Sequence, residues 1–274
     1  MKPTVPDRNF DDLASRFART IYATPRGRIR LAALAQDFAE LSIPLAQARV
    51  LDIGGGQGQF ALQLAKQGAM VDLCDISAEM LRLAQDQFAA AGQPLNSRHC
   101  GLQQAADYFP ATYDIVLNHA VLEWLEEPLA ALPILAQQVK PGGWLSLMFY
   151  NRDGHIWRQL MNGGFTDPLR TNTRLRDEGN APQHPLNPDL IEQQLNALGF
   201  SVQRWRGIRC IYDHLAQKIR DREGEEAVTR ADLEYGTREP FRRLGRYVHF
   251  LAQKKAKEPL NNSAQLCAIY SEAP

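Results

Sequence analysis

The middle of the chain, from residue 48 to residue 150, alternates short apolar runs with amphipathic stretches. Five apolar runs have the length of a β-strand, and they span 49–53, 69–75, 97–101, 113–118 and 144–150. Between them apolar residues recur at helical spacing, which predicts helices over 59–67, 77–92 and 130–139. Strands that alternate with helices require crossover connections, so they form a mostly parallel sheet with helices on both faces. We therefore expect a doubly wound α/β fold.

The two flanks of this region read differently. Apolar residues at helical spacing in 10–40, broken at Pro25, predict one or two helices, and we expect 1–44 to form an N-terminal helical cap. The stretch 152–188 is polar and rich in proline and glycine, so we expect an inserted loop or lid after the fifth strand rather than a strand–helix unit.

The last part of the chain returns to regular structure. A helix is predicted over 188–198, and two β segments, 200–211 and 247–253, are predicted around a polar helix at 212–235. We expect one domain over 1–253 and a flexible tail over 254–274.

Composition excludes several classes of protein. The 274 residues are 45% hydrophobic and have a formal net charge of zero, which suits one sizeable core. No apolar run reaches membrane-helix length, and the N-terminus lacks the pattern of a signal peptide. The four cysteines are scattered without a metal-ligand spacing, so we expect no metal and free buried thiols in a cytoplasmic protein: Cys74, Cys100, Cys210 and Cys267.

A glycine turn follows the first predicted strand, with the sequence Asp52-Ile53-Gly54-Gly55-Gly56-Gln57-Gly58. Glycines let the backbone approach a ligand, and the helix that follows directs free N–H groups toward it. Gly56-x-Gly58-x-x-Ala61 also fits the dinucleotide fingerprint, so a nicotinamide dehydrogenase is an alternative. Asp52 favours the ammonium group of a methionine moiety over a pyrophosphate, and Asp75 can accept hydrogen bonds from ribose hydroxyls.

The motif Asp-x-Gly-x-Gly-x-Gly, together with Asp75 and Tyr113-Asp114, resembles the class I methyltransferases over about residues 45–150. The resemblance implies a Rossmann-like fold and S-adenosyl-L-methionine (SAM) as the cofactor. It further implies that Leu102 and Gln103 hold the adenine, and His119 lies where ligands bind in open α/β folds. The cofactor candidates are Arg30, Asp52, Gly54, Gly55, Gly56, Asp75, Leu102, Gln103 and His119.

Further strings at both ends of the chain are similar to one family, the tRNA 5-carboxymethoxyuridine methyltransferases. They include Asp7-Arg8-Asn9-Phe10-Asp11-Asp12, His119-Ala120-Val121-Leu122-Glu123-Trp124 and Leu244-Gly245-Arg246-Tyr247-x-His249. The resemblance implies methyl-ester formation on the carboxylate of 5-carboxymethoxyuridine at the tRNA wobble position. The partner is then a tRNA anticodon loop, and Arg30 contacts the cofactor, where its guanidinium can pair with a carboxylate.

This reaction needs no general base, because a carboxylate with a pKa near ~4 is already ionised at neutral pH. We therefore expect no catalytic acid–base residue, but a clamp for the substrate carboxylate. Its candidates are Tyr150, Arg209, Tyr212, Arg246 and His249.

Arginines that lie among two tryptophans are candidates for RNA contacts, with the aromatic rings stacking on bases. They are Arg152, Arg158, Arg170, Arg174, Arg176, Arg204, Arg206 and Arg209, with Trp157 and Trp205. The sequence is also compatible with a methyltransferase of a small metabolite and with a non-catalytic cofactor-binding platform.

Overall fold

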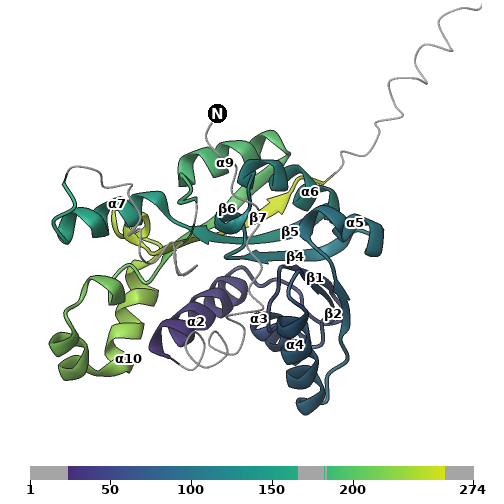
Figure 1. Cartoon of the computed structure of the whole chain (residues 1–274), viewed down its shortest axis with the longest axis horizontal. Helices are drawn as coiled ribbons and strands as arrows, with labels where there is room; N and C mark the ends of the chain where they lie inside the picture. Colours follow the sequence, from purple (N-terminus) through teal and green to yellow (C-terminus); the bar gives the residue numbers. More distant parts are fainter. Residues whose placement is uncertain (1–23, 166–181, 183, 257–274) are drawn as a thin grey trace, which may run out of the picture.

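A computed structural model describes residues 24–165, 182 and 184–256. Within them the chain forms one seven-stranded sheet with the strand order β3-β2-β1-β4-β5-β7-β6 (Figure 1). The strands are β1 (Arg49–Ile53), β2 (Met70–Asp75), β3 (Asn96–His99), β4 (Tyr113–His119), β5 (Val139–Tyr150), β6 (Phe200–Ile208) and β7 (Tyr247–Lys254).

Strands β1 to β5 pair in parallel, whereas β7 runs antiparallel to both β5 and β6. The chain leaves β1 toward β2 on one side and later adds β4 on the other side, so the strand order reverses at β1. Ligands of open α/β sheets bind at this switch point, outside the carboxyl ends of the strands. The predicted doubly wound, mostly parallel sheet is confirmed.

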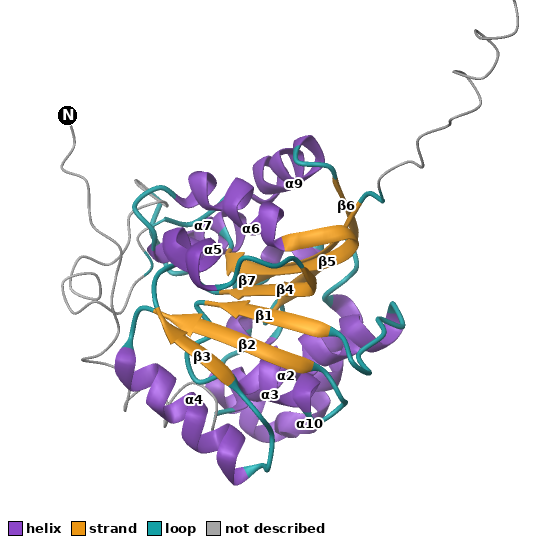
Figure 2. Cartoon of the chain, turned by 90° about the vertical axis from the view of Figure 1, so that its right-hand side faces the viewer, coloured by secondary structure: helices purple, strands orange, loops and turns teal. Residues whose placement is uncertain are grey.

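Helices cover both faces of the sheet (Figure 2). One face carries α2 (Pro25–Glu40), α3 (Gln59–Ala65), α4 (Ala78–Ala90) and α10 (Gln217–Tyr235). The other face carries α5 (Ala105–Tyr108), α6 (Ala131–Gln138) and α9 (Pro188–Ala197). Each layer encloses its own apolar core, because successive side chains of a strand point to opposite faces: Val50 packs with α2 and α3, and Leu51 packs with α6.

Helix α2 begins at Pro25, where the sequence predicted an interruption. Proline is well suited to the first turn of a helix, since the N–H that it lacks has no partner there in any case. Leu34 and Phe38 on the inner face of α2 pack against the sheet. Residues 1–23 of the predicted helical cap lie outside the described residues.

Residues 152–188, where we expected an inserted loop or lid rather than a strand–helix unit, include helix α7 over Arg152–Met161. The side chain of Asn151 caps this helix by accepting a hydrogen bond from the Asp153 N–H at 3.0 Å. The capping residue and the acidic first turn were present in the sequence, but the proline and glycine content of the whole stretch obscured them. Residues 166–181 and 183 lie outside the described part.

Most other predicted elements are confirmed, with ends shifted by a few residues. Ser77 caps α4 as expected, its Oγ accepting from the Met80 N–H at 3.2 Å. Short 3-10 turns complete the fold: Leu102–Gln104, Leu122–Trp124, Pro128–Ala130, Tyr212–His214 and Phe241–Leu244.

Three of the four cysteines are described, and Cys74, Cys100 and Cys210 are all buried free thiols, as predicted. Cys267 and the tail from 257 onward lie outside the described residues. Within residues 24–165, 182 and 184–256, no helix has the length and apolarity needed to cross a membrane. The same residues contain no cluster of histidine, cysteine, aspartate or glutamate able to hold a metal ion.

Candidate functional site

The glycine turn between β1 and α3 leaves space that larger residues would fill. Gly54 has a φ of +70°, and a Cβ there would lie 2.5 Å from a methyl group of Val121. Gly56 has a φ of +55°, and a Cβ there would meet no atom within 4 Å. Both conformations favour glycine, and the open space at Gly56 is where a ligand can approach the backbone. The turn therefore has the shape of a ligand cradle.

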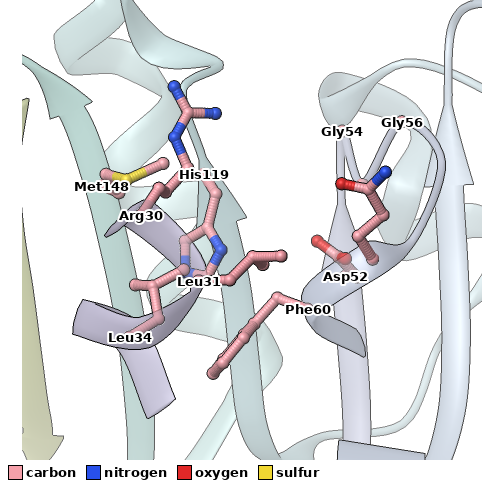
Figure 3. A pocket seen from close by; sticks show the side chains of 11 residues that line it. Arg30, Leu31, Leu34, Asp52, Gly54, Gly56, Phe60, His119 and Met148 are labelled. Carbon is pink, nitrogen blue, oxygen red and sulfur yellow. The ribbon is translucent and has the colours of Figure 1, made fainter. Parts of the chain in front are cut away.

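A pocket opens between this turn and helix α2 (Figure 3). Arg30, Leu31 and Leu34 of α2 lie on one side, and Asp52 and the glycines lie on the other. The structure thus brings six of the nine predicted cofactor residues to one pocket: Arg30, Asp52, Gly54, Gly55, Gly56 and His119.

Asp52 is the most unusual group in this pocket. Its side chain is only 3% exposed, and Oδ1 has no hydrogen-bond partner among the described residues. Burial, with a smaller contribution from the nearby Asp75 carboxylate, raises the pKa of Asp52 to about 8. A buried carboxylate without a partner favours a cation. The methionine part of SAM carries an ammonium group of that charge, so the residues present fit the cofactor.

The raised pKa of Asp52 leads to a prediction about proton release. Because an ammonium ligand favours the carboxylate form, SAM binding near pH 7 should expel the proton held by Asp52. The affinity for SAM should then rise as the pH increases toward about 8, above which the ligand amine itself loses its proton. Calorimetry in buffers with different ionisation enthalpies measures the release. The Asp52→Asn variant should release none, and equal release from variant and wild type would assign the proton to another group.

Asp75 ends β2 and holds the glycine turn in place. Its Oδ2 accepts from the Gly56 N–H at 2.8 Å, and its Oδ1 accepts from the Ser77 N–H at 2.8 Å. A carboxylate oxygen has two lone pairs, so each oxygen can also accept from a ribose hydroxyl. The predicted ribose contact is therefore compatible with this anchoring role.

Replacing Asp75 by alanine should weaken SAM binding by about 1.5–3 kcal/mol, the size of a hydrogen bond to a charged group. Titration calorimetry measures this directly. Asp72→Ala on the same strand is a suitable control, because Asp72 accepts from Tyr113 and Asn96 away from the pocket. Unchanged SAM affinity in Asp75→Ala would contradict the ribose role.

The predicted adenine contacts lie outside this pocket. Leu102 is 5% exposed and packs in the core on the other face of the sheet, whereas Gln103 is exposed. Both follow β3, next to the carboxyl end of β2 where Asp75 lies. Their role toward adenine stays a prediction.

Several arginines, including Arg30, lie around two neighbouring tyrosines. Tyr150 ends β5 and pairs with Tyr247 of β7, their ring centroids 5.8 Å apart. Four guanidinium groups surround the two rings, and we call these residues the arginine cluster. Arg30 and Arg209 lie over Tyr247 at 4.6 and 5.4 Å, Arg246 lies over Tyr150 at 5.2 Å, and Arg158 donates to the Tyr150 hydroxyl at 3.0 Å.

The arginine cluster is partly buried and rich in positive charge. Burial lowers the pKa of Arg209 to about 10, although the Asp213 carboxylate opposes the shift. Asp213 lies 3.4 Å from Arg209 and 4.0 Å from Arg246, so one carboxylate faces two guanidiniums. The Nε atoms of both arginines are buried without a hydrogen-bond partner among the described residues. A partly buried cluster of guanidiniums with unpaired N–H donors favours an anionic ligand.

Two predicted substrate contacts lie elsewhere. His249 is fully buried, with its ring nitrogens hydrogen-bonded to Asp37 and Ser146, so it cannot touch a substrate in this conformation. This corrects the prediction that His249 contacts the substrate, which rested on its place in the C-terminal β region. Tyr212 is partly exposed and stacks under Arg220, with 4.7 Å from guanidinium to ring, rather than joining the two tyrosines.

Some of the expected RNA contacts are also corrected. Trp205 is 7% exposed and packs against Phe250 in the core, so it cannot stack on a base. Arg206 is 1% exposed and, like Arg204, pairs with the buried Asp37. Trp157 on α7 is 39% exposed and remains available. Arg170, Arg174 and Arg176 lie outside the described residues.

Several residues of the site were not predicted. Phe60 and Met148 line the pocket, and their apolar positions in the sequence indicated only a core role. Tyr247 belongs to the arginine cluster, and so does Arg158, which was expected only as an RNA contact. Arg158 follows the capping residue Asn151 at helical spacing, a signal that would have placed it on a helix beside β5.

Comparisons with known proteins agree with this geometry. A family model described as "Methyltransferase domain" matches residues 26–204. The tRNA 5-carboxymethoxyuridine methyltransferase of Escherichia coli (strain K12) is 36% identical over 252 residues, which are 90% of this chain and 97% of that protein. The ubiquinone biosynthesis O-methyltransferase of Paracidovorax citrulli is 35% identical over 111 residues, only 40% of this chain and 47% of that protein.

A solved structure supports the fold. The magnesium protoporphyrin IX methyltransferase of Synechocystis PCC 6803, with bound S-adenosylhomocysteine, has a TM-score of 0.61 and 18% identity, covering 90% of this chain and 96% of that one. The same enzyme with bound SAM has a TM-score of 0.58. The family match also decides against the nicotinamide alternative. The chain belongs to the class I SAM-dependent methyltransferases and, within them, to the family of the tRNA 5-carboxymethoxyuridine methyltransferases.

Proposed function

We propose that this enzyme transfers the methyl group of SAM to the carboxylate of 5-carboxymethoxyuridine at the tRNA wobble position, which gives the methyl ester. The observation that carries the proposal is the arginine cluster next to the cofactor pocket. Arg30 belongs to both, because it lines the pocket and lies over the Tyr247 ring. A substrate anion held by the cluster therefore lies next to the expected cofactor.

The residues present suit methyl transfer to a carboxylate. Bound SAM supplies an electrophilic methyl group on a sulfonium. The cluster holds the carboxylate and orients one oxygen, while Tyr150 and Tyr247 exclude water. No proton has to be removed, because the acceptor is ionised with a pKa near ~4. Esterification removes the negative charge, so Arg209 and Arg246 lose their hold on the product.

Contacts with tRNA are proposed for helix α7, which contributes to the same cluster. Arg158 reaches Tyr150 from this helix, and the neighbouring Trp157 is exposed and can stack on a splayed base. The Escherichia coli (strain K12) relative, of which 97% is matched, is a tRNA enzyme by name. A tRNA substrate would also place the enzyme in the cytoplasm.

The proposal is tested by nucleoside mass spectrometry of tRNA from a strain that lacks this protein. We expect the methyl ester to disappear and 5-carboxymethoxyuridine to accumulate, and both changes should reverse when the gene is restored. Unchanged methyl ester in the deletion strain would contradict the proposal.

A methyltransferase of a small metabolite is the second candidate, and the formal net charge of zero favours it. Binding to RNA rests largely on positive charge, so a tRNA enzyme should show affinity that falls steeply with salt. Methyl transfer to the free nucleoside at a rate equal to that on tRNA would favour the small substrate.

A further inference from the structure

A continuous chain of buried hydrogen bonds leads from helix α2 to the cofactor pocket. Asp37 Oδ2 lies 2.7 Å from His249 Nδ1, and His249 Nε2 lies 2.9 Å from Ser146 Oγ. Ser146 Oγ lies in turn 2.8 Å from Nε2 of His119, which lines the pocket. Asp37, Ser146 and His249 have no measurable exposure, so water does not interrupt the chain.

The sheet register explains why these four side chains meet. Ser146 and Met148 lie on the same face of β5, since side chains alternate along a strand. Met148 pairs with His249 of β7 on one side and with His119 of β4 on the other. Asp37 reaches this face from α2, which covers it. The series of hydrogen bonds therefore crosses the three adjacent strands β4, β5 and β7 beside the pocket.

The charges around Asp37 determine how the protons are arranged. Asp37 Oδ1 accepts from the Arg206 Nε at 2.7 Å, and both side chains are buried. Arg204 Nε lies 3.5 Å from the same Asp37 oxygen and is shared with Glu40, so the Asp37 carboxylate already faces two guanidiniums. A protonated His249 would add a further positive charge to this buried group. A neutral His249 that donates from Nδ1 to Asp37 has only Nε2 left as an acceptor.

The remaining protons follow in order. The Ser146 hydroxyl has one proton, which it donates to His249 Nε2, and its oxygen then accepts from Nε2–H of His119. Burial, with a further contribution from the Arg30 guanidinium, holds the pKa of His119 well below its ordinary value, so the ring is neutral near pH 7. Nδ1 of His119 then carries a lone pair.

We propose that Asp37, His249 and Ser146 are positioning residues that fix the proton of His119 on Nε2, so that Nδ1 presents a hydrogen-bond acceptor to the ammonium group of bound SAM. The inference rests on the proposed cofactor pocket. It gives His119 a defined chemical state, complementary to a cation, on the side of the pocket that faces Asp52 and Gly54 (Figure 3). It also explains why a fully buried histidine and serine lie under a ligand pocket.

The test uses the whole protein with the substitution Ser146→Ala, which removes the hydroxyl oxygen that links His119 to His249. Long-range proton–nitrogen spectra report which ring nitrogen of His119 carries the proton, and calorimetry reports the SAM affinity. In the wild type we expect His119 protonated at Nε2 alone. In Ser146→Ala we expect a mixture of both tautomers and a Kd for SAM raised roughly three- to tenfold, the effect of one lost hydrogen bond.

Tyr113→Phe is the matched control, because it removes the 2.6 Å hydrogen bond that the buried Tyr113 donates to Asp72 at the opposite end of β4. It should change neither the tautomer of His119 nor the SAM affinity. The inference is overturned if wild-type His119 carries its proton on Nδ1, or if Ser146→Ala leaves both measurements unchanged. A wild type that bound no SAM would refute the cofactor pocket instead, while the spectra would still test the chain of hydrogen bonds.

Discussion

Replacing Arg246 by alanine is expected to lower kcat/KM on tRNA carrying 5-carboxymethoxyuridine by about two to three orders of magnitude, while the Kd for SAM stays the same. A preorganised donor at a reacting anion contributes about 3–4 kcal/mol in other enzymes. Arg246 lies over the Tyr150 ring, its Nε has no hydrogen-bond partner among the described residues, and it shares Asp213 with Arg209. The guanidinium is thus available to an anion. Steady-state kinetics and calorimetry measure the two quantities.

Arg243→Ala serves as the control, because Arg243 lies three residues away and pairs with Asp189 and Glu239 at the surface. It should retain nearly full activity, since such exposed pairs contribute little. A loss of SAM affinity in Arg246→Ala would show that Arg246 contacts the cofactor rather than the substrate. Unchanged turnover would show that Arg246 does not hold the substrate carboxylate.

Asp37→Ala should lower the free energy of unfolding by about 3–5 kcal/mol, because it leaves the buried Arg206 guanidinium without a counter-charge. Asp37 connects α2 to two strands through Arg206 and His249, both at 2.7 Å. Arg30 lies two helical turns earlier on α2, so loosening of this helix should also weaken the cofactor pocket. Denaturant unfolding measures the stability.

Glu40→Ala is the control on the same helix. Glu40 pairs with Arg204 at 2.6 Å but is 39% exposed, so its loss should cost at most about 1 kcal/mol. An equally small effect of Asp37→Ala would show that Arg206 finds another partner, and that α2 is held by its apolar face alone.

The cofactor side of the site could be predicted from the sequence because it is local. Asp52, Gly54, Gly55 and Gly56 are neighbours in the chain, and Asp75 ends the next strand of a parallel sheet. The carboxyl ends of adjacent strands lie at one edge, so the pattern alone brings these groups together. The prediction for Arg30 came from the resemblance and that for His119 from its place after the fourth strand, and both residues line the same pocket.

The residues proposed to hold the methyl acceptor were harder to predict from the sequence, because they meet through contacts between segments that are distant in the chain. Tyr150, Arg209 and Arg246 meet only through the antiparallel pairing of β7 with β5 and β6. No feature of the neighbouring sequence distinguishes Arg209 and Arg246 from Arg206, which pairs with Asp37 in the core. His249 was expected to contact the substrate because it lies in the C-terminal β region, but Asp37 of α2 covers this part of β7.

The most direct test of the central claim is single-turnover methyl transfer by the purified enzyme to an anticodon stem-loop carrying 5-carboxymethoxyuridine, with SAM labelled in its methyl group. Mass spectrometry of the digested RNA should find the label in the methyl ester, at a ratio of one methyl per wobble nucleoside. A stem-loop with unmodified uridine should take up none. Label on any atom other than the carboxylate, or no label on the modified stem-loop, would contradict the account.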